Sequence, residues 1–155
     1  MRDKRFIAEH RGGSLKKEQH KYLISWACAC TEHVLQLPGG KIDERLKIAL
    51  FIAREWEKGK ASVGDAMKAS RCAHEVARES SDPVVIAVAR AAGHAVATAH
   101  MADHSLGPAL YALKAVKNAG KSVDQERKWQ NDQLHSDIRE LVLSARTRKE
   151  EHFKI

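Results

Sequence analysis

The sequence is poor in large rings and in cysteine: aromatic residues make up only 5% of 155 positions, and there are three cysteines. So few aromatic side chains exclude a core built of large rings, and the abundance of alanine instead predicts closely packed helices. An odd number of cysteines (Cys28, Cys30 and Cys72) without a secretory-type segment is typical of reduced thiols in a bacterial-type cytosol. We therefore expect a cytoplasmic protein without disulfides.

Long apolar runs are missing as well. Residues 2–5 are all charged and no apolar segment follows them, so we expect no secretory signal. The most apolar run, over residues 84–92, is interrupted by Arg90 and is too short to cross a bilayer. We expect this run to be a buried helix segment and expect no membrane partner.

Sustained alternation of apolar and polar residues is also absent, which disfavours strands. Apolar residues instead recur every three or four positions between Gly, Pro and capping residues, with Ser14 as the N-cap of the first helix. The expected helices run over about residues 14–37, 43–59, 62–80, 83–101, 108–119, 122–134 and 136–149. The sequence predicts an all-α, single-domain bundle of six to seven helices over 1–155, with an irregular segment over 1–13 and a frayed C-terminus over 150–155.

The segment over 83–101 is apolar on nearly every side, and Asp82-Pro83 is a strong helix start, with an acidic N-cap and a proline at the first helical position. An all-round apolar helix usually lies at the centre of a domain. We expect this Ala-rich helix to be central.

A set of polar side chains, here called the polar wall, stands in and just after this segment. Its members are Arg90, His94, His100, Asp103 and His104. On one helix, His100 and His104 would share a face at a spacing that can chelate a transition metal, whereas His94 would point elsewhere. Because a third ligand is missing, we expect no metal and no cofactor.

We expect His94 and His100 to be at least half buried and hydrogen-bonded to neighbouring helices or to the N-terminal segment. Gly12, Gly13 and Gly93 would allow close backbone approach there. Histidines buried in the neutral form predict a fold that acid destabilises. The alternative, a metal-binding protein or enzyme that uses the polar wall, stays open.

No catalytic signature is recognisable. His74-Glu75 begins a zinc-protease-like string, but the position that must hold the second histidine is Arg78. Cys28 and Cys30 would point in different directions on a helix and are expected to be small buried apolar groups. We therefore expect a protein that is not an enzyme.

The formal net charge is +7. Part of the excess is a candidate N-terminal basic patch formed by Arg2, Lys4, Arg5, Arg11, Lys16 and Lys17. Such a charge favours acidic partners or nucleic acid, but exposed aromatics and a docking motif are not evident. We expect an ordinary solvated surface, with a basic nucleic-acid-associated protein as the alternative. An Ala-rich bundle with few aromatics is also compatible with a homo-oligomer.

Several short strings along the chain are family markers. They are His10-Arg11-Gly12-Gly13, Glu32-His33-Val34-Leu35, residues 92–100, Ala102-Asp103-His104, Tyr111-Ala112-Leu113-Lys114-Ala115 and Ile138-Arg139-Glu140-Leu141-Val142. In these strings the chain resembles a family of small bacterial immunity proteins of toxin–immunity systems, over about residues 5 to 145. The resemblance implies a compact helical protein that binds and blocks a cognate protein toxin without chemistry of its own. It implies no role for any single residue.

Overall fold

A computed structural model describes residues 2–155. The seven α-helices in this part of the chain are α1 (Lys17–Val34), α2 (Glu44–Glu57), α3 (Val63–Glu79), α4 (Pro83–Ala97), α5 (Leu106–Asn118), α6 (Val123–Asp132) and α7 (Ser136–Phe153). Three short 3-10 helices accompany them: η1 (Lys4–Phe6), η2 (Glu9–Arg11) and η3 (Ala102–Ser105). Residues 2–155 contain no strand, only an isolated bridge between Ala8 and Leu15. The predicted all-α bundle is confirmed.

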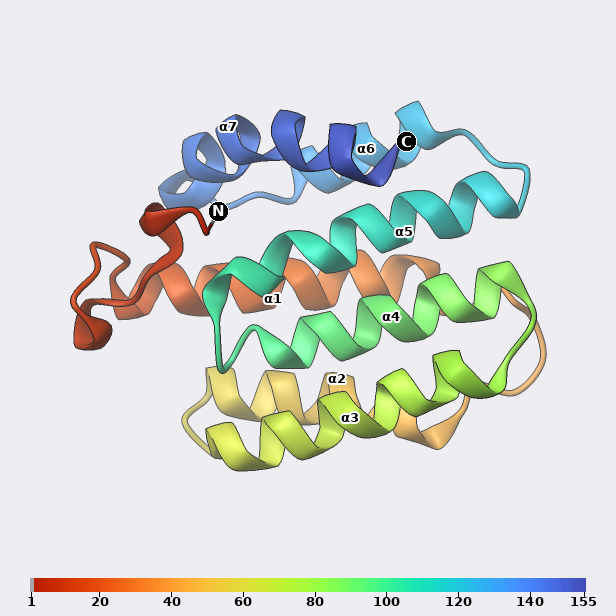
Figure 1. The fold of residues 1–155 in the computed structure, drawn as a ribbon, viewed down its shortest axis with the longest axis horizontal. Helices are drawn as coiled ribbons and strands as arrows, with labels where there is room; N and C mark the ends of the chain where they lie inside the picture. The colour runs from red at the N-terminus through yellow and green to blue at the C-terminus, as the bar shows by residue number, and fades with distance from the viewer. Residues whose placement is uncertain (1) are drawn as a thin grey trace.

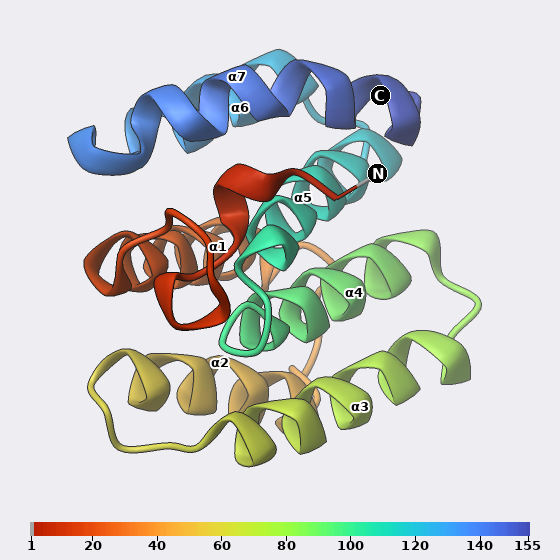
Figure 2. The same ribbon diagram turned by 60° about the vertical axis from the view of Figure 1, so that its left-hand side comes forward.

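The helices form a layered bundle. Helices α6 and α7 lie along one side, α2 and α3 lie along the opposite side, and α1, α4 and α5 run between them (Figure 1; Figure 2). Helix α4 packs against α1, α2, α3 and α5. It starts as predicted, because the Asp82 side chain accepts a hydrogen bond from the Val84 amide at 2.8 Å and Pro83 holds the first turn. The expectation of a central Ala-rich helix is confirmed.

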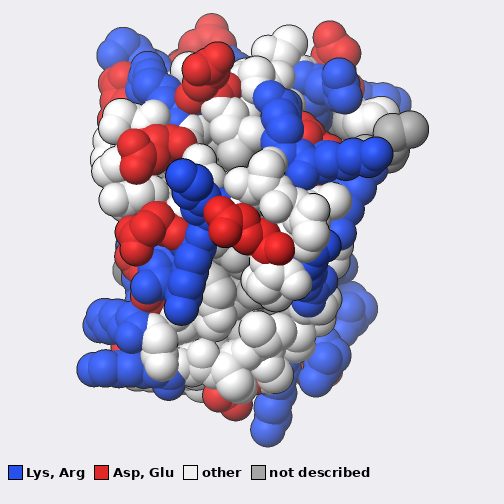
Figure 3. Space-filling model, turned by 90° about the vertical axis from the view of Figure 1, so that its left-hand side faces the viewer, with Lys and Arg blue, Asp and Glu red and all other residues white. Residues whose placement is uncertain are grey.

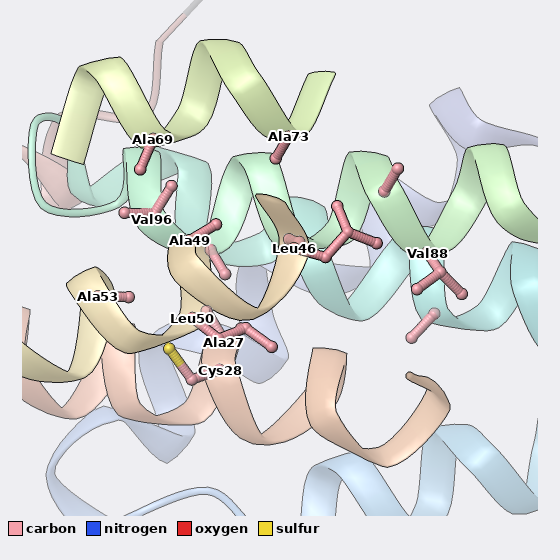
Figure 4. Packing of buried hydrophobic residues seen from close by; sticks show 14 of the residues in the cluster. Ala27, Cys28, Leu46, Ala49, Leu50, Ala53, Ala69, Ala73, Val88 and Val96 are labelled. Carbon is pink, nitrogen blue, oxygen red and sulfur yellow. The ribbon is translucent and has the colours of Figure 1, made fainter. Parts of the chain in front are cut away.

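Small side chains set the spacing of the main core. Alanines of α2 and α3, among them Ala49, Ala69 and Ala73, lie in one buried cluster with the valines Val88 and Val96 of α4 (Figure 4). Because an alanine has only a methyl group, the backbones approach closely and the helices interdigitate with few voids. This is how a sequence with few rings still fills a core.

A second apolar cluster lies beneath the N-terminal segment. Phe6 is only 1% exposed, and it packs in the same cluster as Trp26, Leu106 and Ile138. The segment over 1–13, expected to be irregular, forms two single 3-10 turns in its described part. Because Phe6 is buried in the second apolar cluster, this segment packs against the helices and covers one end of the bundle (Figure 2).

Several helix ends differ from the expectation. Helix α1 ends at Val34 rather than near Leu37, and α5 begins at Leu106 rather than at Pro108. Helix α1 starts at Lys17 rather than at Ser14, because Leu15 exchanges backbone hydrogen bonds with Ile7 and Glu9 instead of entering the helix. Helix α7 continues to Phe153 beyond the predicted end near Lys149. Helix α4 ends at Ala97 instead of Met101, and this difference reshapes the candidate site.

Candidate functional site

A contact from α1 meets the end of α4. Thr98 is the C-cap, and its carbonyl oxygen, which the next helical turn would use, accepts a hydrogen bond from His20 Nε2. The Thr98 hydroxyl also donates to the His94 carbonyl at 2.9 Å, and the Thr98 amide donates to the same oxygen at 3.1 Å. The chain then leaves the helix, so His100 lies in a turn and His104 lies on η3. The expectation that His100 and His104 share one helix face is wrong.

The structure brings together a different set of groups, here called the histidine cluster: His74, Arg90, His94, His104 and Tyr111. Arg90 Nη1 donates to His74 Nδ1 at 2.7 Å, and the Nδ1 atoms of His94 and His104 lie 3.3 Å apart. The His94 ring also stacks on Tyr111, with centroids 5.5 Å apart and planes 10° apart. The cluster thus joins α3, α4, η3 and α5.

Two glycines make room for these rings. A Cβ atom at Gly93 would lie 2.6 Å from the His74 ring, and one at Gly107 would lie 2.9 Å from the ring of His94. Such distances are far inside van der Waals contact, so an alanine at either position would force the neighbouring histidine to shift. Close approach was expected at Gly93, and it is confirmed; Gly13 likewise lies against the backbone of Ile7, whereas Gly12 serves a turn with a positive φ of 85°.

Burial keeps the three imidazoles of the histidine cluster uncharged near neutral pH. Burial, reinforced by the positive charge of Arg90, lowers the pKa of His74 to about 4. Burial also lowers the pKa of His94 to about 4, and the neighbouring His74 and His104 act in the same direction. The pKa of His104 is lowered too, mainly by burial and against the pull of Asp103. In this neutral state, one ring nitrogen of the His94–His104 pair donates and the other accepts.

The polar wall is therefore split between two places. Arg90, His94 and His104 belong to the histidine cluster, whereas His100 lines a pocket on another side. Asp103 is held by Arg2, whose Nε donates to its Oδ2 at 3.0 Å. The expected hydrogen bond is present for His94, but His100 Nδ1 is buried without a partner among the described residues. Both rings are more than half buried, as expected.

The metal alternative finds little support in this arrangement. The pair considered from the sequence, His100 and His104, is separated by the turn after α4. Within residues 2–155 no group of three His, Cys, Asp or Glu side chains converges as metal ligands. The two nitrogens that do approach each other, on His94 and His104, form a hydrogen bond.

The pocket that His100 lines, here called the N-terminal pocket, has a volume of about 710 Å³. Its lining residues come from the N-terminal segment, the start of α1, the end of α2, the start of α3 and the turn after α4, and they are Ala8, Glu9, His10, Arg11, Leu15, Lys17, His20, Trp56, Val63, Ala99 and His100. Figure 3 looks onto this end of the bundle, where Lys and Arg side chains flank a largely uncharged area in the lower half of the view.

Four members of the candidate N-terminal basic patch lie in two different surroundings. Arg2 is paired with Asp103, and Arg5 is paired with Asp3 at 2.7 Å and bonded to Ser144. Arg11 and Lys17, by contrast, line the N-terminal pocket. The two arginines nearest the N-terminus are thus partly neutralised, and their cationic groups hold the N-terminal segment against η3 and α7.

Sequence reasoning missed a buried polar network between α1, α5, α6 and α7. Gln130 is fully buried; its carbonyl oxygen accepts from Trp26 Nε1 at 2.8 Å and its Nε2 donates to the Ala109 carbonyl at 3.0 Å. Its Oε1 accepts from Arg146, which is only 3% exposed and also binds Glu150. No spacing in the sequence marks these residues, because the partners come from four helices. They were also absent from the expected site, as were His20, His74 and Trp56.

The cysteines behave as expected for buried apolar groups. Cys28 and Cys30 are fully buried and all three cysteines are free. Burial raises the pKa of the Cys28 thiol to about 12 and raises that of Cys30 as well. Neither thiol is available as a nucleophile at neutral pH.

Comparison with protein families supplies the identification. A family model described as "Imm-5 like putative immunity protein" matches residues 13–137, which span α1 to α6. The chain belongs to this immunity-protein family. No curated protein and no solved structure matches it. In this family member, no helix among the described residues is both long and apolar enough to cross a membrane.

Proposed function

We propose that the chain neutralises a cognate protein toxin in the cytoplasm by binding to it, with no catalytic step of its own. The observation that carries this proposal is the family match over residues 13–137. The histidine cluster supports a scaffolding role for the polar wall, since His74, His94 and His104 bind neighbouring groups and have lowered pKa values.

The outer face of α2 supports a docking surface. In the part of the chain that the structure describes, the exposed large apolar side chains are Ile48, Phe51 and Val63. Phe51 is 61% exposed and Ile48 is 51% exposed, and both lie on one helix face because they are three residues apart. An aromatic anchor beside an aliphatic one is a common composition for the centre of a protein interface.

Ion pairs border this apolar pair along the helix. Glu44 and Lys47 pair at 3.3 Å before it, and Glu55 and Lys58 pair at 3.6 Å after it. An apolar centre within a charged rim is the usual anatomy of a non-obligate interface. We therefore place the toxin-binding surface on the outer face of α2.

The test is co-expression with the toxin encoded beside the gene of this chain. The wild-type chain should restore growth, and F51D should lower the affinity for the purified toxin at least about 10-fold, because a charge replaces an interface anchor. The matched control is T147D, which places the same acid on the exposed side of α7. A toxin that kills equally with and without the chain overturns the proposed function.

The same variants separate a toxin from a second copy of this chain as the occupant of α2. If the wild-type chain is a dimer in solution and F51D is a monomer with unchanged toxin affinity, then α2 is a homo-oligomer interface and the proposed docking surface is wrong. Light scattering coupled to size exclusion measures the mass of each variant. Unchanged affinity without a change of mass would also remove α2 from the toxin interface.

A further inference from the structure

We propose that the N-terminal pocket is a binding site for a small organic anion, one in which a carboxylate or phosphate is attached to a flat apolar ring. The pocket is distinct from the outer face of α2, so the proposal does not depend on toxin binding. It rests on the size of the cavity, on its aromatic wall and on the charges at its rim.

The dimensions fit a small molecule. A volume of about 710 Å³ lies within the range of small-molecule sites, and the lining combines buried apolar side chains with a few polar groups. Leu15 and Ala99 are buried beneath the surface of the pocket. The lining segments also belong to the packed domain, because Leu15 joins the apolar cluster beneath the N-terminal segment and pairs with the backbone of residues 7 and 9. The cavity is therefore preformed.

Rings form one side of the pocket. The Trp56 indole lies against the His20 imidazole, with centroids 4.7 Å apart and planes tilted by 50°. His20 cannot turn freely, because its Nε2 donates to the Thr98 carbonyl. Trp56, at the end of α2, is only partly buried and lines the cavity. A flat ligand can stack on this indole, as aromatic ligands commonly do.

The rim is positively charged. Arg11 and Lys17 line it together with His10, and Glu9 is the single acidic side chain in the lining. Arg2 and Arg5 are each paired with an aspartate, whereas no ion pair joins Arg11 or Lys17 to a carboxylate within residues 2–155. Burial lowers the pKa of His20 against the opposing effect of its hydrogen bond to Thr98, and the charges of His10 and Arg11 act in the same direction as burial. An anion entering the pocket therefore meets cations that are free to pair with it.

His100 adds an adaptable polar group. Its ring lines the pocket, and its Nδ1 is buried without a hydrogen-bond partner among the described residues. No hydrogen bond to Nδ1 therefore fixes which of the two ring nitrogens of His100 carries a proton. Nε2 can then donate a hydrogen bond to a ligand or accept one from it. The same lining therefore holds an aromatic wall, two cations and an imidazole whose Nδ1 has no partner among the described residues.

Isothermal titration of the full chain tests the site. The probes are indole-3-acetate and adenosine 5′-monophosphate, and the neutral comparison ligands are indole and adenosine. We expect at least one of the two anions to bind with one-to-one stoichiometry at millimolar concentration or below, and its neutral counterpart to bind at least about 10-fold more weakly. Failure of both anions to bind overturns the proposal, and so does equal binding of the neutral ligands.

The double variant R11E/K17E should weaken binding of the anion at least about 10-fold, because two attractive charges become repulsive. The control K117E/K121E makes the same change of net charge at exposed positions near the end of α5 and should bind as the wild type does. Thermal unfolding of both variants verifies that they fold. Equal binding by R11E/K17E and the wild type would overturn the assignment of the rim.

Toxin binding by R11E/K17E distinguishes the two proposals. If this variant loses the toxin and the wild-type chain binds neither anion, the pocket is part of the toxin interface and the small-molecule site is wrong. If the variant keeps the toxin and loses the anion, both proposals hold. If the wild type binds the anion but no toxin, only the proposed function fails.

Discussion

Lowering the pH from 7 to 5 should destabilise the fold through the histidine cluster. The pKa values of His74 and His94 are about 4 in the folded chain, against an ordinary value of 6.5. A lowered pKa means that the folded state resists protonation, so the stabilisation is complete above pH 6.5. It is lost as the pH falls below 6.5, because the unfolded chain takes up protons first, and the loss continues down to about pH 4.

The magnitude follows from proton linkage. A histidine with a pKa of 6.5 in the unfolded chain and about 4 in the folded chain lowers the free energy of unfolding by up to about 2 kcal/mol between pH 7 and pH 5. The two rings are partly buried and interact with each other, so screening by solvent and coupling reduce the sum. We expect the free energy of unfolding to fall by about 2–3 kcal/mol in all.

Urea unfolding at pH 7 and pH 5 measures this loss. The variant H94Q removes one titrating ring and keeps a polar side chain, so its stability should depend on pH by about half as much as that of the wild type. The control H152Q replaces an exposed histidine near the end of α7 and should keep the full dependence. Equal stability of the wild-type chain at both pH values, or an undiminished pH dependence in H94Q, would refute the reasoning.

Three other predictions concern packing and reactivity. G93A should lower the free energy of unfolding by about 2 kcal/mol, because its Cβ would lie 2.6 Å from the His74 imidazole. The control G64A should leave stability unchanged or raise it, since the nearest atom to its Cβ would be 3.6 Å away. Equal melting temperatures of the two variants would contradict this prediction. Q130A should lower the free energy of unfolding, measured in urea, by about 2–4 kcal/mol, because it removes a hydrogen-bond partner of the buried Arg146 guanidinium. A loss below about 1 kcal/mol would contradict this prediction. Cys28 and Cys30 should resist alkylation by iodoacetamide in the native protein at pH 8 and should react in denaturant. Mass spectrometry of the intact chain measures the number of alkylated thiols. Rapid alkylation of these two thiols in the native protein would contradict their burial.

Local signals predicted most helix starts. Ser62 and Asp65 form a capping box where the helix expected over residues 62–80 begins, with the Asp65 amide donating to Ser62 Oγ at 3.0 Å and the Ser62 amide donating to the Asp65 carboxylate at 3.2 Å. Ser122 likewise accepts from the amide of Gln125. These interactions join residues three positions apart, so a single sequence contains both partners. The start of α1 was missed because Leu15 is drawn into contacts with residues 7 and 9, which no local pattern records.

The candidate site was predicted less well than the fold. His94 is a buried, hydrogen-bonded ring, as expected, and His104 is its hydrogen-bond partner. The rings that pack against it, those of His74 and Tyr111, lie on other helices and were not part of the expected set. The N-terminal pocket could not be foreseen, since its walls come from five separate segments. A glycine such as Gly93 did mark a close approach, although the sequence did not say which ring approaches it.

The amino-acid sequence alone determined the class of fold, a count of six to seven helices and the central place of the Ala-rich helix, because helix periodicity, capping and residue size act over a few neighbouring positions. Only the tertiary structure decided where that helix stops. The carbonyl of Thr98 accepts a hydrogen bond from His20, which is 78 positions away in the chain. This bond fastens the turn after α4 to α1, and the turn places His100 on the N-terminal pocket and His104 on η3. A contact between residues so far apart leaves no pattern among neighbouring positions, so only the folded chain reveals it.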